Sequence, residues 1–367
     1  KHHANLLSFL NETDPENGHV SDFIISCAQK GKLTTFFPTD HAEQRKILDL
    51  VTDSAFQNEQ SLILFSATYN TLLEKIQPPV RTYLIDRIIA TIQQPDSTFA
   101  LQLRVILQYY QEKHPDLLSA PDNAKISAII SRYGSVDLKP YVITDFSRWK
   151  EDSQLASLSI FQHDDDGSIS YHSNSRNLLN NGYQPRLSTS LSLLPDHDSR
   201  LQTAQNLIHQ AAKRPTQVIR ELYRLSAHVP IIVEWYKEVN GLELSHAVAV
   251  YQNDVLQQQL LKQFLEQEME MFAQRGHSYW REEQLIEPMT ALIETGAISS
   301  DSLSAINRFM SIGSCGGLRI YTTLNKLFNN TIDIMATVGT GKAVVNNPYN
   351  QQLFEIIATS PNTVSWE

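Results

Sequence analysis

Cysteine is scarce in this chain of 367 residues, which contains only Cys27 and Cys315. Two cysteines cannot build the disulfide framework that stabilises small secreted domains. A bridge between them would also consume Cys315, whose sequence surroundings indicate a reactive thiol. We therefore expect both side chains to be reduced.

Charged residues are also sparse, at 19% of the chain, and the formal net charge is −10. Binding to nucleic acid phosphates or to an anionic membrane surface requires clustered Lys and Arg. No apolar run reaches the roughly 18 residues of a membrane span. The composition thus argues against nucleic acid and membranes as binding partners.

The length is ample for a sizeable core and predicts two domains, or one large domain with an extension. The chain starts at Lys1 rather than Met and shows no signal peptide. We expect the numbering to begin after a removed leader, as in an exported protein, or inside a longer chain. It stops at Glu367 soon after a helical pattern, so we expect the native C-terminus to lie further on. The compartment is left open.

Residues 1–138 have the pattern of an α-helical domain. Apolar residues recur every three or four positions, and prolines at 78–79, 95, 115 and 121 separate the segments. The expected helices include residues 42–51, 62–76, 81–92 and 100–112. The aromatic residues of this region form its core or, as an alternative, a groove for a protein partner: Phe36, Phe37, Phe65, Tyr69, Tyr109 and Tyr110.

Residues 139–367 alternate between strand-like and helical patterns. This alternation predicts an α/β domain with a parallel sheet, right-handed crossovers and flanking helices. Residues 243–250 fit either a strand or the start of a helix, and residues 173–198 predict a long surface loop. The expected strands are 141–144, 158–162, 228–235, 269–273, 309–313 and 331–338.

Cys315 follows the short apolar run of residues 309–313 and precedes a helical pattern at 318–328. A thiol at a tight turn from a strand to a helix is exposed beyond the sheet, and the helix N-terminus favours the thiolate. Gly313, Ser314, Gly316 and Gly317 allow a substrate backbone to come close. This arrangement is typical of a nucleophile, although an isolated cysteine in an apolar strand is most often a buried small hydrophobe.

His277 lies 38 residues before Cys315 and follows another apolar run, residues 269–273. Ligands of open parallel sheets bind beyond the carboxyl ends of the strands. If the two strands are neighbours, an imidazole lies beside a thiol. The imidazole then lowers the pKa of the thiol and acts as a general base.

The segments RGHSYW and GSCGG, each after an apolar strand and in the order His then Cys, resemble the caspase–gingipain class of cysteine peptidases. The similarity is greatest to gingipain-like and CHAT-like bacterial proteins. It extends to IDIMATVGTGKAVVNNP, which resembles the next strand and its loop, and it covers roughly the C-terminal half of the chain. The resemblance implies a caspase/gingipain-like parallel sheet, preceded here by the α-helical domain.

The resemblance also implies roles for several residues. His277 and Cys315 correspond to the catalytic dyad of a peptidase that cleaves proteins or peptides, and the amides of Ser278 and Gly316 to the oxyanion site. Ser278 departs from the pattern, because this class usually has Gly after the His. Thr340 belongs to the implied wall of the substrate pocket, and Trp280 lines the pocket or covers the core. No metal or organic cofactor is required, although some relatives use calcium.

Asp164, Asp165 and Asp166 follow the expected strand 158–162 and come just before Gly167. Asp-Gly is a strong turn signal, so a β-turn is one interpretation. The resemblance suggests another, in which these acids orient the catalytic His or select a basic side chain of the substrate. Glu234 is a further candidate to orient His277, or else it forms an ion pair.

Other functions compete with peptide hydrolysis. A catalytically inactive scaffold on the same fold and a thiol acyltransferase or deamidase use the same sequence features. A papain-like pair of Cys27 and His246 lacks the glycines and aromatic residues usual around such a cysteine. Gly339 and Gly341 lie too close together for a phosphate-binding loop.

Overall fold

The computed structural model describes residues 23, 27, 32, 37–56, 58–94, 97–275, 285–313, 317–337 and 341–367. The chain forms two compact units, Lys1–Val142 and Ile143–Glu367. Each unit has its own hydrophobic core.

The described part of the first unit is helical. Asp40 and Asn58 cap the first two of these helices by accepting hydrogen bonds from the amides of Glu43 and Ser61. Pro78 and Pro79 occupy the first turn of α6, where proline is tolerated because those amides have no helical partner. The elements are α4 (His41–Ala55), α5 (Glu59–Lys75), α6 (Pro78–Ile92), α7 (Ala100–Lys113), η1 (Pro115–Leu117), α8 (Ala120–Tyr133) and α9 (Lys139–Val142).

The helical pattern predicted for this region is confirmed by α8, which begins at the expected break around Pro121-Asp122. In the structure Pro121 lies in the first turn, and Asp122 completes a capping box with Ser119. Tyr69 and Tyr110 pack edge to face at 4.8 Å between ring centroids in the core of this unit. Phe37, Phe65 and the buried Cys27 belong to the same core. Their burial favours the core interpretation of these aromatic residues, whereas Phe36 lies outside the described residues.

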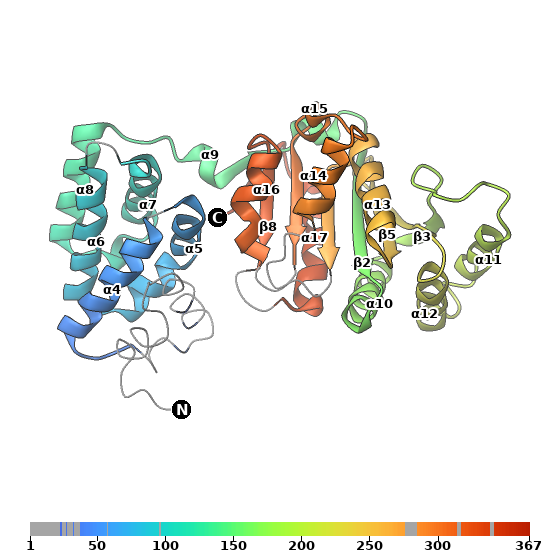
Figure 1. The fold of residues 1–367 in the computed structure, drawn as a ribbon, viewed down its shortest axis with the longest axis horizontal. Coiled ribbons are helices and arrows are strands. Elements are labelled where there is room, and N and C mark those ends of the chain that lie inside the picture. Colours follow the sequence, from blue (N-terminus) through green and yellow to red (C-terminus); the bar gives the residue numbers. More distant parts are fainter. Residues whose placement is uncertain are drawn as a thin grey trace. The chain divides into compact units, whose positions relative to one another are not determined.

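The second unit contains a mostly parallel seven-stranded sheet flanked by helices (Figure 1). The strand order across the sheet is β3-β4-β5-β2-β6-β7-β8. β5, β2, β6, β7 and β8 are parallel neighbours. The strands are β2 (Gln154–Gln162), β3 (Gln184–Leu187), β4 (Val233–Val239), β5 (Leu242–Tyr251), β6 (Met271–Arg275), β7 (Arg308–Ile312) and β8 (Ile332–Ala336).

The expectation of a parallel sheet is wrong for β3 and β4, because β4 is antiparallel to both of its neighbours. Asn240 and Gly241 connect β4 to β5 with φ angles of 51° and 81°. Two consecutive positive φ angles make a tight hairpin turn, which returns the chain alongside the strand it has just left. This turn also decides that residues 243–250 form a strand.

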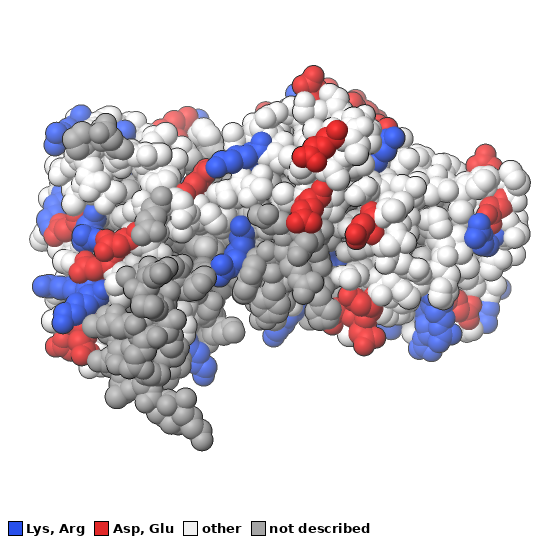
Figure 2. Space-filling model, in the orientation of Figure 1, with Lys and Arg blue, Asp and Glu red and all other residues white. Residues whose placement is uncertain are grey.

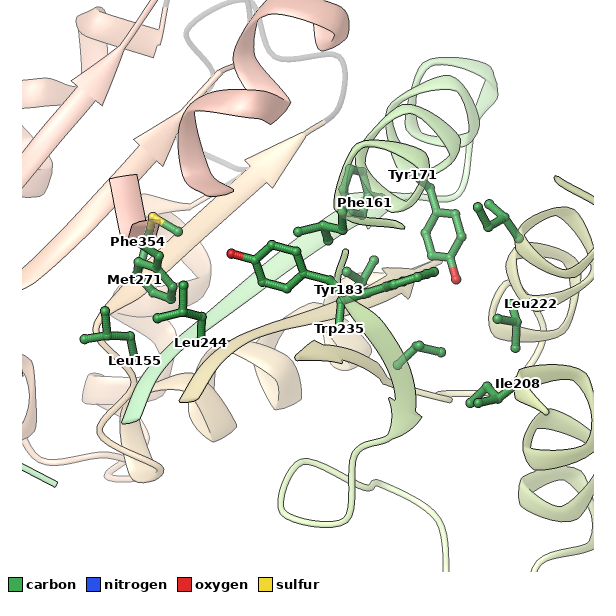
Figure 3. Packing of buried hydrophobic residues seen from close by; sticks show 14 of the residues in the cluster. Leu155, Phe161, Tyr171, Tyr183, Ile208, Leu222, Trp235, Leu244, Met271 and Phe354 are labelled. Carbon is green, nitrogen blue, oxygen red and sulfur yellow. The ribbon is translucent and has the colours of Figure 1, made fainter. Parts of the chain in front are cut away.

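Helices cover both faces of the sheet, which gives three layers. One face packs against α10 (Asp165–Asn180), α11 (Ser199–Ile208), α12 (Pro215–Ser226) and α17 (Ala343–Thr359). The other face packs against α13 (Asp254–Glu266), α14 (Ile286–Glu294), α15 (Ser300–Leu303) and α16 (Tyr321–Leu327). Figure 3 shows the first of these cores, in which Tyr183, Trp235 and Leu244 belong to the same buried cluster as Phe354 of α17.

Residues 141–144 are not a strand of this sheet. Tyr141 and Val142 end α9, and β1 (Ile143–Asp145) pairs antiparallel with β9 (Thr363–Ser365) in a separate two-stranded sheet. The indole of Trp366 donates a hydrogen bond of 2.8 Å to Thr144 Oγ1. The C-terminal residues are thereby tied to the start of the second unit.

Within the described residues, no helix is both long and apolar enough to cross a membrane. Figure 2 shows acidic and basic side chains interspersed on the visible face. Only 19% of the residues in the chain are charged.

Candidate active site

The carboxyl ends of the parallel strands define the candidate site. Along the chain the parallel strands follow one another as β2, β5, β6, β7 and β8. Across the sheet their order is β5-β2-β6-β7-β8. The winding therefore reverses between β2 and β6. In doubly wound sheets ligands bind in the crevice beyond the strand ends at this reversal.

Most of the candidate residues follow these strand ends in the sequence. His277 comes two residues after the last residue of β6, Cys315 three residues after that of β7, and Thr340 four residues after that of β8. Ser278, Trp280 and Gly316 belong to the same segments. All six residues lie outside the described part of the chain. The described residues just before and just after these three segments form the surroundings of the candidate site.

Glycines flank the position of Cys315 because the backbone there leaves no room for a side chain. A Cβ atom on Gly317 would lie 2.7 Å from the carbonyl oxygen of Ile312, and one on Gly341 would lie 2.1 Å from that of Gly313. A Cβ atom on Gly313 would lie 2.6 Å from the guanidinium carbon of Arg275. Such close approach to a backbone carbonyl oxygen, as at Gly317 and Gly341, is possible only for glycine. The ends of β7 and β8 are therefore packed tightly together at the candidate site.

The acidic residues after β2 begin a helix. The side chain of Asp164 caps α10 by accepting a hydrogen bond of 2.6 Å from the amide of Gly167, and Asp165 and Asp166 are exposed in its first turn. The β-turn interpretation of this segment is wrong, because the capping carboxylate and the glycine start a helix. A Cβ atom on Gly167 would lie 1.7 Å from the carbonyl oxygen of Gln162, so α10 starts directly against the end of β2. These acids lie at the carboxyl end of β2, beside the reversal between β2 and β6.

Glu234 belongs to a different part of the sheet. It lies near the start of β4, with β5 and β2 between β4 and β6. Its carboxylate accepts hydrogen bonds of 2.8 Å from Arg186 Nε and 2.6 Å from Ser188 Oγ. Arg186 also contacts Glu243, and these two acids raise the pKa of the guanidinium above its usual value. The contacts favour the ion-pair interpretation of Glu234.

Arg275 is the principal residue at this edge that the sequence analysis did not single out. It ends β6, its exposed fraction is 3%, and each of its five N–H groups has an acceptor. Nη1 donates to the carbonyl oxygens of Gln274 and Ser311, at 2.9 Å each. Nε donates to Asn347 Oδ1 at 3.1 Å. The remaining donor group, Nη2, contacts Ser311 Oγ at 3.2 Å and the carbonyl oxygen of Asn346 at 3.4 Å.

The asparagines of α17 connect this network to the neighbouring elements. Asn346 Nδ2 donates to the carbonyl oxygen of Gly313 at 2.8 Å, and Asn347 Nδ2 to that of Ser170 in α10 at 3.0 Å. The sequence motif that ends in Asn-Asn-Pro resembles a loop, but these residues belong to a helix in which Pro348 is near the N-terminal end. Arg275, Asn346 and Asn347 thus join β6, β7, α10 and α17.

Two amide side chains at the same edge have a buried oxygen atom that retains acceptor capacity. Gln274 Nε2 donates to Tyr251 Oη at 3.2 Å, but within the described residues Gln274 Oε1 and Gln162 Oε1 accept no hydrogen bond. Gln162 ends β2, and Gln274 is the penultimate residue of β6. Both flank the reversal in winding, so they are suited to accept hydrogen bonds from a ligand bound there.

His246 is buried in the sheet of the second unit. Its Nδ1 lies 2.7 Å from Ser157 Oγ, and its ring stacks on Phe354 at 4.8 Å between centroids. Burial lowers the pKa of His246 to about 3, so the ring is neutral near pH 7. Cys27 is enclosed in the core of the other unit. The burial of each residue in its own core argues against the papain-like pair.

A cavity of about 490 Å³ lies elsewhere, between the end of β3 and α11. Arg186, Ser188 and the loop around His197 line it. Asp198 in this loop pairs with Arg200, and the hydrogen bonds from Arg200 lower the pKa of Asp198 to about 2. β3 is the outermost strand on the side of the sheet away from β6 and β7. We therefore treat the carboxyl ends of β2, β6 and β7, not this cavity, as the candidate active site.

In the described residues, no three side chains of His, Cys, Asp or Glu are grouped to hold a metal ion. The chain matches no protein-family model, no curated protein and no solved structure.

Proposed function

We propose that the protein is a cysteine peptidase in which His277 and Cys315 form the catalytic dyad. One observation carries the proposal. β6 and β7 are adjacent parallel strands, with Gln274 opposite Ile312, so the chain leaves both strands at the same edge of the sheet. His277 and Cys315 follow those two strand ends in the sequence. The tight glycine packing around the Cys315 segment supports the same conclusion, because a nucleophile turn needs close backbone approach.

The fold proposed for the second unit follows from the same features. We assign it to the caspase/gingipain-like class, with an α-helical domain before it. Its mostly parallel sheet with helices on both faces is compatible with that class. The antiparallel pairings of β4 with β3 and β5 lie on the opposite side of β2 from β6 and β7, where they do not separate the proposed dyad.

The proposed reaction uses the two residues in sequence. Cys315 transfers its proton to His277, and the thiolate attacks the carbonyl carbon of the substrate. The amides of Ser278 and Gly316 stabilise the resulting oxyanion. The C–N bond breaks as His277 returns the proton to the leaving amine. Water then hydrolyses the thioester and restores the thiol.

Replacing Cys315 by alanine tests this assignment. Cys315→Ala is expected to abolish cleavage of a peptide library while leaving the unfolding temperature near that of the parent protein. Cys27→Ala is the matched control and should retain cleavage, because Cys27 is buried in the other unit. Cleavage by Cys315→Ala at the parent rate contradicts the proposal.

The same protein preparation separates the rival functions. Mass spectrometry of the protein after mixing with substrate should detect an acyl group on Cys315. Release of that group to water supports a peptidase, whereas transfer to an added amine supports an acyltransferase. A folded protein whose Cys315 forms no adduct with an electrophile supports an inactive scaffold.

A further inference from the structure

We propose that the free edge of β3 and the cavity beside it bind an extended peptide segment that carries a basic side chain. The inference goes beyond the proposed function and uses none of the residues proposed for catalysis. Every residue on which it rests belongs to the described part of the chain. It starts from β3, which is the outermost strand on its side of the sheet and pairs with β4.

Leu187 presents unpaired backbone groups along this edge. The amide of Ser188 donates to the carbonyl oxygen of Ile232 at 3.0 Å, and Leu187 lies opposite Val233 in the antiparallel register. Neighbouring residues of a strand direct their backbone groups to opposite sides, so the amide and the carbonyl of Leu187 are directed away from β4. Neither group has a hydrogen-bond partner in the described residues. An edge of this kind is a template for a further strand.

The cavity lies along this edge rather than under one face of the sheet. Successive side chains of a strand point to opposite faces, so Leu187 points to one face and Arg186 and Ser188 point to the other. All three residues line the cavity, together with Gln202 and Gln205 of α11. Its volume of about 490 Å³ lies within the range of roughly 300–1,000 Å³ that is usual for ligand sites. The cavity therefore offers space for a peptide strand beside Leu187.

The polar groups that line the cavity favour a basic side chain. The exposed carboxylate of Asp196 has no hydrogen bond or ion pair with any described residue. Arg186, the one arginine of the lining, is already paired with two glutamates and is not free to attract an anion. Gln202 and Gln205 contact neighbouring side chains through their amide nitrogens, which leaves their oxygen atoms as acceptors. An ammonium group supplies the donors and the positive charge that these acceptors lack.

Strand geometry places the basic residue opposite Leu187. A residue that exchanges both backbone hydrogen bonds with Leu187 has its side chain on the same face of the sheet as Leu187. That face is the one that α11 covers, so a lysine at this position extends towards Gln202 and Gln205. A second copy of this chain is a poorer occupant, because Pro185 on the same edge has no amide to donate and its β3 supplies no free cation for Asp196.

The test measures the binding of a short fluorescent peptide of threonine and valine with one lysine to the full chain, by fluorescence anisotropy. Methylation of the lysine amide nitrogen removes the donor to Leu187 and should weaken binding by about tenfold. Methylation of the next amide nitrogen, which is directed to the other side of the strand, should change binding by less than about twofold. Norleucine in place of lysine should weaken binding by about two- to fivefold, the effect of one exposed ion pair.

Two variants at exposed positions and one cross-linking experiment locate the bound peptide. Asp196→Asn should abolish the preference for lysine over norleucine, whereas Asp301→Asn, at an exposed position of α15, should preserve it. A photoreactive leucine analogue beside the lysine should form cross-links to residues 186–205, which peptide mass spectrometry identifies. Circular dichroism establishes that each variant is folded.

Equal affinities for the two methylated peptides overturn the inference, as does the absence of binding at about 1 mM peptide. A preference for lysine that survives in Asp196→Asn, or cross-links confined to other parts of the chain, also overturns it. Loss of peptide binding as the protein dimerises would assign the edge to a second copy, with the same consequence. Binding of the peptide at this edge without cleavage of any peptide contradicts only the proposed function, whereas cleavage without such binding contradicts only this inference.

Discussion

Two buried arginines at opposite ends of neighbouring strands show how the two edges of the sheet differ. Arg275 ends β6 at the carboxyl edge, and Arg308 begins β7 at the amino edge. Both are almost completely buried, and burial lowers the pKa of each to about 10. Their hydrogen bonds and their charged neighbours are different.

Arg308 is close to acids and only partly hydrogen-bonded. The charges of Glu268 and Glu270 oppose the effect of burial on its pKa. Nη1 donates to the carbonyl oxygens of Ser302 and Leu303, but in the described part of the chain Nε and Nη2 have no acceptor. The guanidinium instead lies over the ring of Phe264, at 5.5 Å from its centroid. Arg308 thus has an acid nearby in Glu268, whereas burial keeps Glu270 largely protonated near pH 7.

Arg275 has the opposite combination, with complete hydrogen bonding and no acid among its hydrogen-bond partners. The carboxyl edge also holds the glycines at which no Cβ atom fits. In the described residues a buried arginine is thus satisfied by hydrogen bonds at the carboxyl edge, and by a nearby acid and an aromatic ring at the amino edge.

The largest expected effect is at the glycine where α10 meets β2. Gly167→Ala should lower the free energy of unfolding by more than about 3 kcal/mol, because the new methyl group overlaps the carbonyl oxygen of Gln162. Ile169→Ala, at an exposed position of the same helix, should change it by less than about 0.5 kcal/mol. Urea unfolding followed by circular dichroism measures both. Equal stability of the two variants would show that the start of α10 moves freely.

The next largest effect separates the two arginines. Arg275→Met leaves the acceptors of Ser311 and Asn347 without a donor and should cost about 3 kcal/mol of unfolding free energy. Arg308→Met should cost about 1 kcal/mol, because part of the guanidinium has no hydrogen bond to lose in the described structure. The same urea titration ranks them, and a greater loss for Arg308→Met would reverse the comparison of the two edges.

A smaller effect concerns the pH dependence of stability at the amino edge. Burial raises the pKa of Glu270 to about 8, although the amide of Ala156 donates to its carboxylate at 2.7 Å. The folded protein then binds more protons than the unfolded chain between about pH 4.5 and pH 8. The contribution of Glu270 to stability is complete below about pH 4.5 and is lost as the pH rises through 8.

Glu270→Gln tests this contribution, because glutamine keeps an oxygen for the amide of Ala156 and cannot ionise. The variant should lose less stability than the parent between pH 5 and pH 8. Thermal unfolding at a series of pH values measures the difference. Parallel pH profiles for the two proteins would mean that Glu270 does not titrate in this range.

The sequence predicts the main parts of the second unit and its mostly parallel sheet, but not the antiparallel pairings of β4. Local patterns predict β6 and β7, because each strand is a short apolar run. A local pattern also predicts the turn at Asn240-Gly241. The antiparallel direction of β4 depends on its pairing with β5 across that turn. Burial of Arg275 depends on contacts with Asn346 and Asn347, about 70 residues away in the chain. No local pattern reveals such a contact, because an arginine at the end of a strand is usually exposed.

The most direct test of the central claim is the pH dependence of Cys315 alkylation in the parent protein and in His277→Ala, with Cys27 as the internal reference. An active dyad predicts fast labelling of Cys315, with an apparent pKa well below the ordinary value of about 8.5 and a rise in that pKa when His277 is replaced. Cys27 should label slowly because it is buried in the helical core. Slow labelling of Cys315 with an ordinary pKa, unchanged in His277→Ala, would contradict the claim that the carboxyl edge is a thiol active site.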